Sequence, residues 1–367
     1  MNTIIFIVIL LVLVLVHELG HFATAKWFKV RVDEFGFGFP PKAMTLFKRG
    51  ETEYTLNWLP IGGFVKIFGE EVSDDATNGP EASRSFINKP KWQQAIILVA
   101  GIAANFLLAW LLFSVSFMSG LPSSVQGAPA NAKLTNVQLT VVSVLKDSPA
   151  YEGGVKAGDQ IISIQSGKDI EYNLNPESLK KFIVAHGESE ILVQYMRKNY
   201  IDPGTHTVKP ELNDAGVPSI GIAMDEIGTM RLPFFGAFVA GAELTWNVTK
   251  GTVTGLYGII KSAVTGAGGI RDSITGPVGM VKVVGDASQF GFAYLLSFAA
   301  LISVNLAVIN FIPFPALDGG RLLFVLIEKI KGSRISPNVA NVANMVGFWL
   351  LILLMVFVTY NDIAKLI

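Results

Sequence analysis

The sequence predicts a polytopic α-helical membrane protein with four transmembrane helices, a membrane-associated β region and one extracytoplasmic domain of mixed α and β structure. Hydrophobic residues make up 51% of the 367 residues and charged residues only 16%, a composition typical of chains that cross a membrane several times. Four stretches are long and apolar enough to cross a hydrocarbon core of ~30 Å. Between the second and third stretches, residues 126–225 have a soluble composition and the length of a compact domain.

Charge and cysteine content limit the function classes. Lys and Arg together number 29, as do Asp and Glu, so no excess positive charge favours nucleic acid as a partner. The chain has no cysteine, which excludes disulfides and thiolate metal sites. Any transition-metal site must therefore use histidine and carboxylate ligands. Of the four histidines, two lie in one short motif of the first span.

The first span contains His17-Glu18-Leu19-Gly20-His21. The thirteen apolar residues from Ile4 to Val16 cover only ~20 Å as a helix, so the helix must continue through the motif to cross the membrane. His17 and His21 then share one helix face and can bind one metal ion, with Glu18 beside them, as in zinc proteases. A secretory signal peptide is the alternative, but the required basic amino-terminal region is missing.

Residues 32–69 predict a small apolar sheet. Three segments have strand character, namely Phe35–Pro40, Tyr54–Leu59 and Gly62–Ile67. The sheet is either a cytosolic hairpin or a structure that dips into the membrane, where protein or water must cover its backbone groups. Residues 70–91 are polar and rich in turn signals, which predicts a loop.

The second span covers Ala95–Met118, and Asn105 within it is interpreted as a helix-packing contact. The soluble stretch that follows predicts strands at Val141–Leu145, Gln160–Ile164 and Ile191–Met196, and a helix from Pro176 to His186. The residue order at Ser148-Pro149-Ala150 and Gly154–Gly167 resembles a PDZ domain, which usually binds extended peptides at a sheet edge. His186 and His206 lack ligand-spaced neighbours, so we interpret both as surface histidines.

After this domain, Leu232–Val264 predicts one or two interfacial helices, and Phe290–Ile312 predicts the third span. Pro313 and Pro315 must break this span within the membrane, so Asp318 is expected on an irregular backbone. A carboxylate in that setting indicates a functional site, although an Asp-Gly-Gly turn at the membrane boundary is an alternative. The fourth span covers Val342–Tyr360.

The basic residues predict which side each loop faces. They flank the connections between spans one and two and between spans three and four, so both connections are expected in the cytoplasm. The amino terminus, the PDZ-like domain and the carboxyl terminus then lie outside, and the motif lies nearer the cytoplasmic side. The basic residues concerned are Lys26, Lys29, Arg31, Lys89, Lys91, Arg321, Lys329, Lys331 and Arg334.

Together, the motif at His17–His21, the PDZ-like domain and the segment Asn310–Gly320 resemble the site-2 protease family of intramembrane zinc metalloproteases. Within it they resemble the bacterial RseP-like branch, which cleaves anti-sigma factors. The resemblance covers nearly the whole chain. It implies that Asp318 is the third zinc ligand, that the β region is a membrane-reentrant loop and that residues 232–264 are the amphipathic segment after the PDZ region.

The resemblance also implies bacterial inner-membrane location and a role in regulated intramembrane proteolysis. The expected substrate is a single-span membrane protein, similar to an anti-sigma factor, that another protease has already cut outside the membrane. Two departures matter. The segment Ala100–Asn105 lacks the proline that commonly follows this glycine, and only one PDZ-like unit fits between the spans.

The chemistry of the residues agrees with this assignment. His17, His21 and one carboxylate leave zinc an open position for water, as a catalytic site requires. Zinc lowers the pKa of that water, and Glu18 is placed to act as general base in the attack on the peptide bond. Asn310 is expected to bind the extended substrate or the developing oxyanion, although helix packing is an alternative role.

Residues 1–125 are thus expected to hold spans one and two, residues 126–226 the PDZ-like domain, residues 227–285 the amphipathic segment and residues 286–367 spans three and four. Two other functions compete with an intramembrane protease: a PDZ scaffold without catalysis, and a membrane-anchored zinc protease with cytosolic substrates. The first leaves the buried motif unexplained. The second needs a soluble catalytic domain, for which residues 32–91 are too few. The PDZ-like domain is expected to limit substrate access, with capture of a new carboxyl terminus as the competing role.

Overall fold

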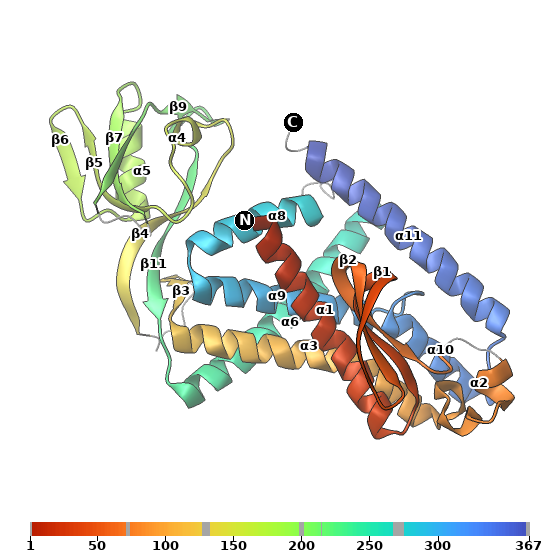
Figure 1. Ribbon diagram of the computed structural model, residues 1–367. Helices are drawn as coiled ribbons and strands as arrows, with labels where there is room; N and C mark the ends of the chain where they lie inside the picture. The colour runs from red at the N-terminus through yellow and green to blue at the C-terminus, as the bar shows by residue number, and fades with distance from the viewer. Residues whose placement is uncertain are drawn as a thin grey trace. The chain divides into compact units, whose positions relative to one another are not determined.

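The computed structural model describes residues 2–70, 74–126, 133–197, 202–213, 215–266 and 275–364. The chain divides into two compact units (Figure 1). The first unit contains residues 1–113, 238–284 and 298–367, and the second contains residues 114–237 and 285–297.

Four helices in the described part of the chain are long and apolar enough to cross a membrane: α1 (Asn2–Trp27), α3 (Lys91–Ser119), α9 (Phe292–Phe311) and α11 (Pro337–Ala364). They confirm the four spans predicted from the sequence. In their most apolar windows, α3 and α9 are 39% and 50% buried, whereas α1 and α11 are only 17% and 11% buried. The first two therefore form the centre of the bundle, and the other two expose most of their apolar surface, as helices facing lipid do.

Small side chains allow α3 and α9 to pack closely. Ala109 on α3 and Ala300 and Val304 on α9 are fully buried in a shared apolar cluster. Ser303 Oγ donates a hydrogen bond to the Asn105 carbonyl at 2.8 Å, which links the two helices in their buried interface. Small and hydroxyl residues at a helix crossing are typical of membrane bundles.

A third helix, α6 (Phe234–Thr265), contributes Leu244, Val248 and Leu256 to the same apolar cluster. It is one continuous helix, which resolves the choice between one helix and two over residues 232–264. Phe235, Val239 and Val264 are highly exposed on its other side. Its apolar residues thus occur on packed and exposed faces alike.

The β region forms one twisted antiparallel sheet from two long strands, β1 (Val32–Arg49) and β2 (Thr52–Ile67), beside α1 (Figure 1). Each strand folds back on itself. Phe35 pairs with both Tyr54 and Val65, so the start of β1 lies between the two halves of β2. The three predicted segments are all in the ladder, and a fourth, Lys42–Arg49, extends it by pairing with residues 52–57.

Glycines allow these strands to fold back. Gly38 and Gly62 have φ angles of +82° and +81°, which side chains rarely tolerate, and both precede or follow proline-containing bends. The outer half of the sheet exposes large apolar side chains, including Phe47 at 53% and Trp58 at 71%. Large apolar patches are rarely exposed to water, so this surface suits contact with lipid or with a substrate.

The polar stretch after the sheet is more ordered than the expected loop. It contains the short helix α2 (Asp74–Asn78) and two 3-10 turns, at Ala82–Arg84 and Phe86–Asn88. The Asn88 amide donates to the carbonyls of Ala76 and Ala82, which holds these turns together. The sequence predicted a loop here because these short turns are stabilised by side-chain hydrogen bonds between them and not by the helix propensity of their residues.

The second unit is built on a sheet in the order β3-β11-β4-β5-β7-β8, with β6 paired to β5. Its strands are β3 (Leu121–Ser124), β4 (Leu134–Val144), β5 (Gln160–Ser166), β6 (Asp169–Tyr172), β7 (Ile191–Met196), β8 (Gly204–Val208) and β11 (Ile222–Met230). A short β9 (Glu211–Leu212) pairs with β10 (Pro218–Ser219), and α4 (Pro149–Glu152) is one turn.

One helix, α5 (Pro176–Ala185), covers the core of this unit. Asn175 starts the helix because its side chain accepts hydrogen bonds from the amides of Glu177 and Ser178. Leu179 and Phe182 on its inner face join a core that includes Ile164 and Ile191. These elements confirm the strands and helix predicted in residues 141–196.

Candidate metal centre

The HExxH segment lies within α1, as predicted, with His17 and His21 on the helix face that meets α3. Only 7% and 6% of these residues are exposed. Glycines make the close approach possible: a Cβ on Gly20 would lie 2.4 Å from the Ala100 carbonyl oxygen, and a Cβ on Gly101 would lie 2.3 Å from His21 Nε2. The Gly101 backbone therefore leaves the space that the His21 ring occupies.

Asp318 is the first residue of α10 (Asp318–Lys331). The expectation of an irregular backbone at this position is therefore wrong, although the span does break at residues 312–317, as predicted. The break folds tightly against the new helix. A Cβ on Gly319 would lie 2.3 Å from the Ile312 carbonyl oxygen, and one on Gly320 would lie 2.2 Å from that of Phe314. The two glycines are required for this close packing rather than for a free turn.

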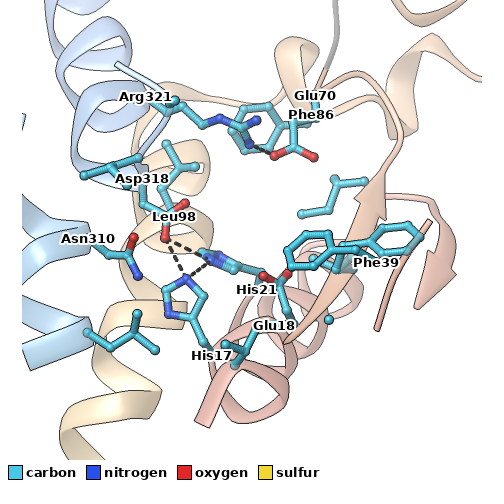
Figure 2. Close-up of a pocket in the computed structure, with 18 residues that line it drawn as sticks. His17, Glu18, His21, Phe39, Glu70, Phe86, Leu98, Asn310, Asp318 and Arg321 are labelled. Carbon is cyan, nitrogen blue, oxygen red and sulfur yellow. Dashed lines mark hydrogen bonds and ion pairs between the residues drawn. The ribbon is translucent and has the colours of Figure 1, made fainter. Parts of the chain in front are cut away.

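The structure brings the three side chains together, although Asp318 is distant from the motif in sequence (Figure 2). Asp318 Oδ2 lies 2.9 Å from His17 Nε2 and 3.2 Å from His21 Nε2. The two Nε2 atoms are themselves 3.2 Å apart. One ligand atom from each residue thus lies within 4.8 Å of the other two.

Hydrogen bonds behind the rings fit this group to a metal ion. His21 Nδ1 donates to the Ile97 carbonyl oxygen at 2.8 Å, so in the neutral ring the Nε2 lone pair faces Asp318. A lone pair and a carboxylate oxygen at this distance repel each other unless a proton or cation lies between them. Metal-binding histidines commonly have such a carbonyl partner on the other ring nitrogen. Two nitrogens and one carboxylate oxygen are also a common zinc donor set.

Asn105 is a site residue whose role the sequence did not reveal. Its side-chain amide lies 3.3 Å from His17 Nδ1, and the residue is fully buried. Asn105 therefore orients His17 as well as packing α3 against α9. The only sequence signal was an amide within a long uncharged span, which does not distinguish these roles.

Glu18 lines a cavity of about 420 Å³ together with His17, His21 and Asp318. The backbone N–H of Val65 on β2 lies close to its carboxylate. The β region therefore places a backbone amide beside Glu18. Val65 belongs to the edge segment of the sheet, whose residues 63–65 also line the cavity.

Asn310 lies near the end of α9 and lines the same cavity, with its side chain pointing towards the converging side chains (Figure 2). At another part of the wall, Arg321 on α10 forms an ion pair with Glu70. Neither residue of this pair was expected at the site from the sequence. The cavity thus has a cluster of ionisable groups, one amide and an otherwise apolar wall.

The sequence model that describes peptidase family M50 matches residues 5–354 of this chain. The chain belongs to this family. Family M50 is the site-2 protease family, and its members are intramembrane zinc metalloproteases. Membership confirms the resemblance seen in the sequence and makes this chain a membrane zinc protease, in agreement with the donor set of the cavity.

Individual relatives cover almost the full length of the chain. A protein of Clostridium perfringens named as a candidate zinc metalloprotease is 36% identical over 96% of this chain and 95% of its own length. The regulator of sigma-W protease RasP of Bacillus subtilis is 32% identical over 100% of this chain and 99% of its own. Protease RseP of Yersinia pestis is 29% identical over 98% of both chains.

Proposed function

We propose that this protease uses His17, His21 and Asp318 to hold zinc and Glu18 as general base, and that it cleaves single-span membrane proteins within the bilayer. The observation that carries the proposal is the convergence of His17 Nε2, His21 Nε2 and Asp318 Oδ2 within 4.8 Å. These residues belong to α1 and to the segment after α9. The two histidines are buried within a membrane-spanning helix, where polar side chains are costly without a ligand.

The residues of the cavity divide the chemistry between them. When bound, zinc supplies Lewis-acid chemistry that activates water near neutral pH and polarises a carbonyl group. Glu18, which lies beside the Val65 amide, accepts the proton of the attacking water and transfers it to the leaving amine. His21 keeps its orientation through the Ile97 carbonyl oxygen.

The substrate must unwind before it can be cut, because a helical peptide bond is shielded by its own hydrogen bonds. Unwinding exposes backbone groups that need partners in a low-dielectric site. Gly63, Phe64 and Val65 of the sheet edge line the cavity and offer backbone groups to an extended segment. Asn310, opposite them, offers both a donor and an acceptor to the substrate or to the oxyanion.

Replacing Asn310 with alanine is therefore expected to lower turnover about 100- to 1,000-fold, as for the loss of an oxyanion donor. Zinc content should stay unchanged because the side chain is not among the three converging groups. Turnover of a single-span substrate and metal analysis of the same preparation provide the two measurements. Loss of zinc or unfolding of the variant would instead support a helix-packing role.

Two observations support a substrate class: the site histidines lie within a membrane-spanning helix, and the relatives include a named regulatory protease. We propose an anti-sigma factor or similar protein, because one relative is named as a regulator of sigma-W protease. The basic residues that flank the connection between α1 and α3 and lie in the connection between α9 and α11, including α10, favour a cytoplasmic position for both connections, with the active site near that side. The second unit is then extracytoplasmic.

The direct test uses the purified chain in detergent with candidate single-span proteins. Cleavage is expected, together with its loss on addition of a zinc chelator and its return when zinc is restored. Cleavage of soluble unfolded proteins in preference to membrane segments would favour the membrane-anchored protease with cytosolic substrates. A chain that binds zinc but cleaves neither class would contradict the proposal.

The second unit is proposed to be a PDZ-like domain that limits access to the active site. A groove between α5 and β11 supports the competing role, in which the domain binds a peptide. Ile183 and Val184 on α5 face Ile222 and Met224 on β11 across a cavity of about 310 Å³. In the described residues, β3 pairs with β11 only from Ile227 onwards, so residues 222–225 keep one free edge for an added strand.

Deletion of residues 126–225 distinguishes the two roles. The Val125 N–H donates to the Glu226 carbonyl oxygen at 2.9 Å, so a short turn can join these residues without disturbing the rest of β3 and β11. If the domain is a filter, the deletion variant is expected to cleave substrate that still carries its large external domain. Cleavage rates of trimmed and untrimmed substrate give the measurement.

A receptor role predicts the opposite sign: the same deletion slows cleavage of trimmed substrate and leaves untrimmed substrate uncut. Replacing Val184 with aspartate provides a matched control, because Val184 lines the groove but is half exposed, so the change blocks the groove and keeps the core of the domain. Under the filter role this variant should behave like the unchanged chain: it should cleave trimmed substrate and refuse untrimmed substrate. Refusal of untrimmed substrate by a folded, active deletion variant would exclude the filter.

A further inference from the structure

The segment that presents Asp318 contains a backbone conformation that its own sequence does not favour. Ala316, two residues before Asp318, has a φ angle of +74°. Residues with a side chain rarely adopt this left-handed region, and they keep it only when their surroundings hold it. Contacts outside residues 312–317 must therefore stabilise this conformation.

Those contacts come from α11, the fourth span. The Ala316 N–H donates a hydrogen bond to Asn344 Oδ1 at 3.2 Å. One turn further along α11, a Cβ on Gly347 would lie 2.4 Å from the Pro315 carbonyl oxygen, so the two backbones are in direct contact there. Residues three apart share one helix face, so Asn344 and Gly347 form one contact surface for the loop.

The loop has little freedom to absorb a change at this surface. The Leu317 N–H donates to the Phe314 carbonyl oxygen at 3.1 Å, and the Arg321 N–H donates to the Leu317 carbonyl oxygen at 3.2 Å. These bonds join the loop to the first turn of α10, which begins at Asp318. A displacement of residues 315–316 would therefore move the Asp318 backbone with it.

We propose that Asn344 and Gly347 are positioning residues that hold Asp318 against His17 and His21. The proposal rests on the metal site proposed above and adds the fourth span to it. Apart from this contact face and the contact of Val358 and Asp362 with Gly276, α11 is largely exposed, with only 11% of its apolar window buried. Through Asn344 and Gly347, a displacement of α11 would change the geometry of the third ligand.

The test measures metal binding by the full-length chain in detergent, independently of cleavage. Zinc affinity is measured by competition with a chelator, and the visible spectrum of the Co²⁺-loaded protein reports ligand geometry. We expect Asn344→Leu to weaken zinc binding about 10- to 100-fold, the usual effect of losing a partner that orients a ligand. The Co²⁺ spectrum should change as well, and hydrogen exchange at the Ala316 amide should accelerate in metal-free protein.

The chain supplies a matched control on the same helix. Asn341 is one turn before Asn344, and both residues line a second cavity next to α10. Only Asn344 accepts the hydrogen bond from the Ala316 amide. Asn341→Leu is expected to keep zinc affinity and the Co²⁺ spectrum unchanged. Gly347→Ala disturbs the loop sterically without removing the hydrogen bond, so it tests the proposal independently if Asn344→Leu does not fold. It should weaken zinc binding too.

Two outcomes overturn the proposal in distinguishable ways. If Asp318→Asn lowers zinc affinity but folded Asn344→Leu and Gly347→Ala bind zinc like the unchanged chain, the metal site stands and the role of α11 is wrong. If Asp318→Asn itself leaves zinc affinity and the Co²⁺ spectrum unchanged, the metal site and the positioning role both fail. Weakened binding in both α11 variants, with normal binding in Asn341→Leu, supports the proposal.

Discussion

Replacing Glu18 with glutamine is expected to lower cleavage by about 100- to 10,000-fold, the range attributed to general acid–base catalysis, while zinc stays bound. Glutamine has nearly the shape of glutamate, so it can occupy the same place beside the Val65 amide. It cannot accept a proton from water at neutral pH. The measurements are turnover of a single-span substrate and zinc content of the same purified protein.

Two further variants sharpen this prediction. Glu18→Asp keeps the base but withdraws it by one methylene, so it should retain more turnover than Glu18→Gln. Glu70→Gln removes a different carboxylate of the same cavity, one that is paired with Arg321, and should reduce turnover much less. Substantial turnover by zinc-loaded Glu18→Gln would mean that another group acts as the base.

The sequence was most informative where the membrane restricts the possible structures. A spanning segment must satisfy its backbone groups internally, so an apolar run such as Ile4–Val16 has little choice but helix. The same argument extended that helix through His17 and His21 and placed them on one face. Their spacing within one helix is local information, and the structure agrees with it.

The contacts between distant segments were not accessible in the same way. Asp318 could be named from its setting and from the family resemblance, but no local pattern showed that α10 begins there or that its carboxylate meets the histidines. The fold of the β region depends on two glycines, Gly38 and Gly62, that allow strands to reverse without a conventional hairpin turn. The pairing of Asn105 with His17 required the packing of α3 against α1.

The second large effect is expected for Asp318→Asn. The variant keeps the shape of the side chain but removes the negative charge and the strong oxygen donor 2.9 Å from His17 Nε2. Loss of a partner that only orients a ligand costs about 10- to 100-fold in metal affinity, so loss of the ligand itself should raise the zinc Kd at least ~100-fold. Cleavage should fall in parallel and recover in part at high zinc concentration.

A matched control separates loss of a ligand from the general cost of changing a buried carboxylate. Asp159 in the second unit is also fully buried, but its oxygens accept hydrogen bonds from the Arg197 guanidinium and the Lys156 amide. Asp159→Asn should lower thermal stability without changing zinc affinity. Because an amide can neither replace a carboxylate ligand nor pair with a guanidinium as a carboxylate does, the two variants should fail differently. Equal zinc affinity in Asp318→Asn and the unchanged chain would exclude Asp318 as a ligand.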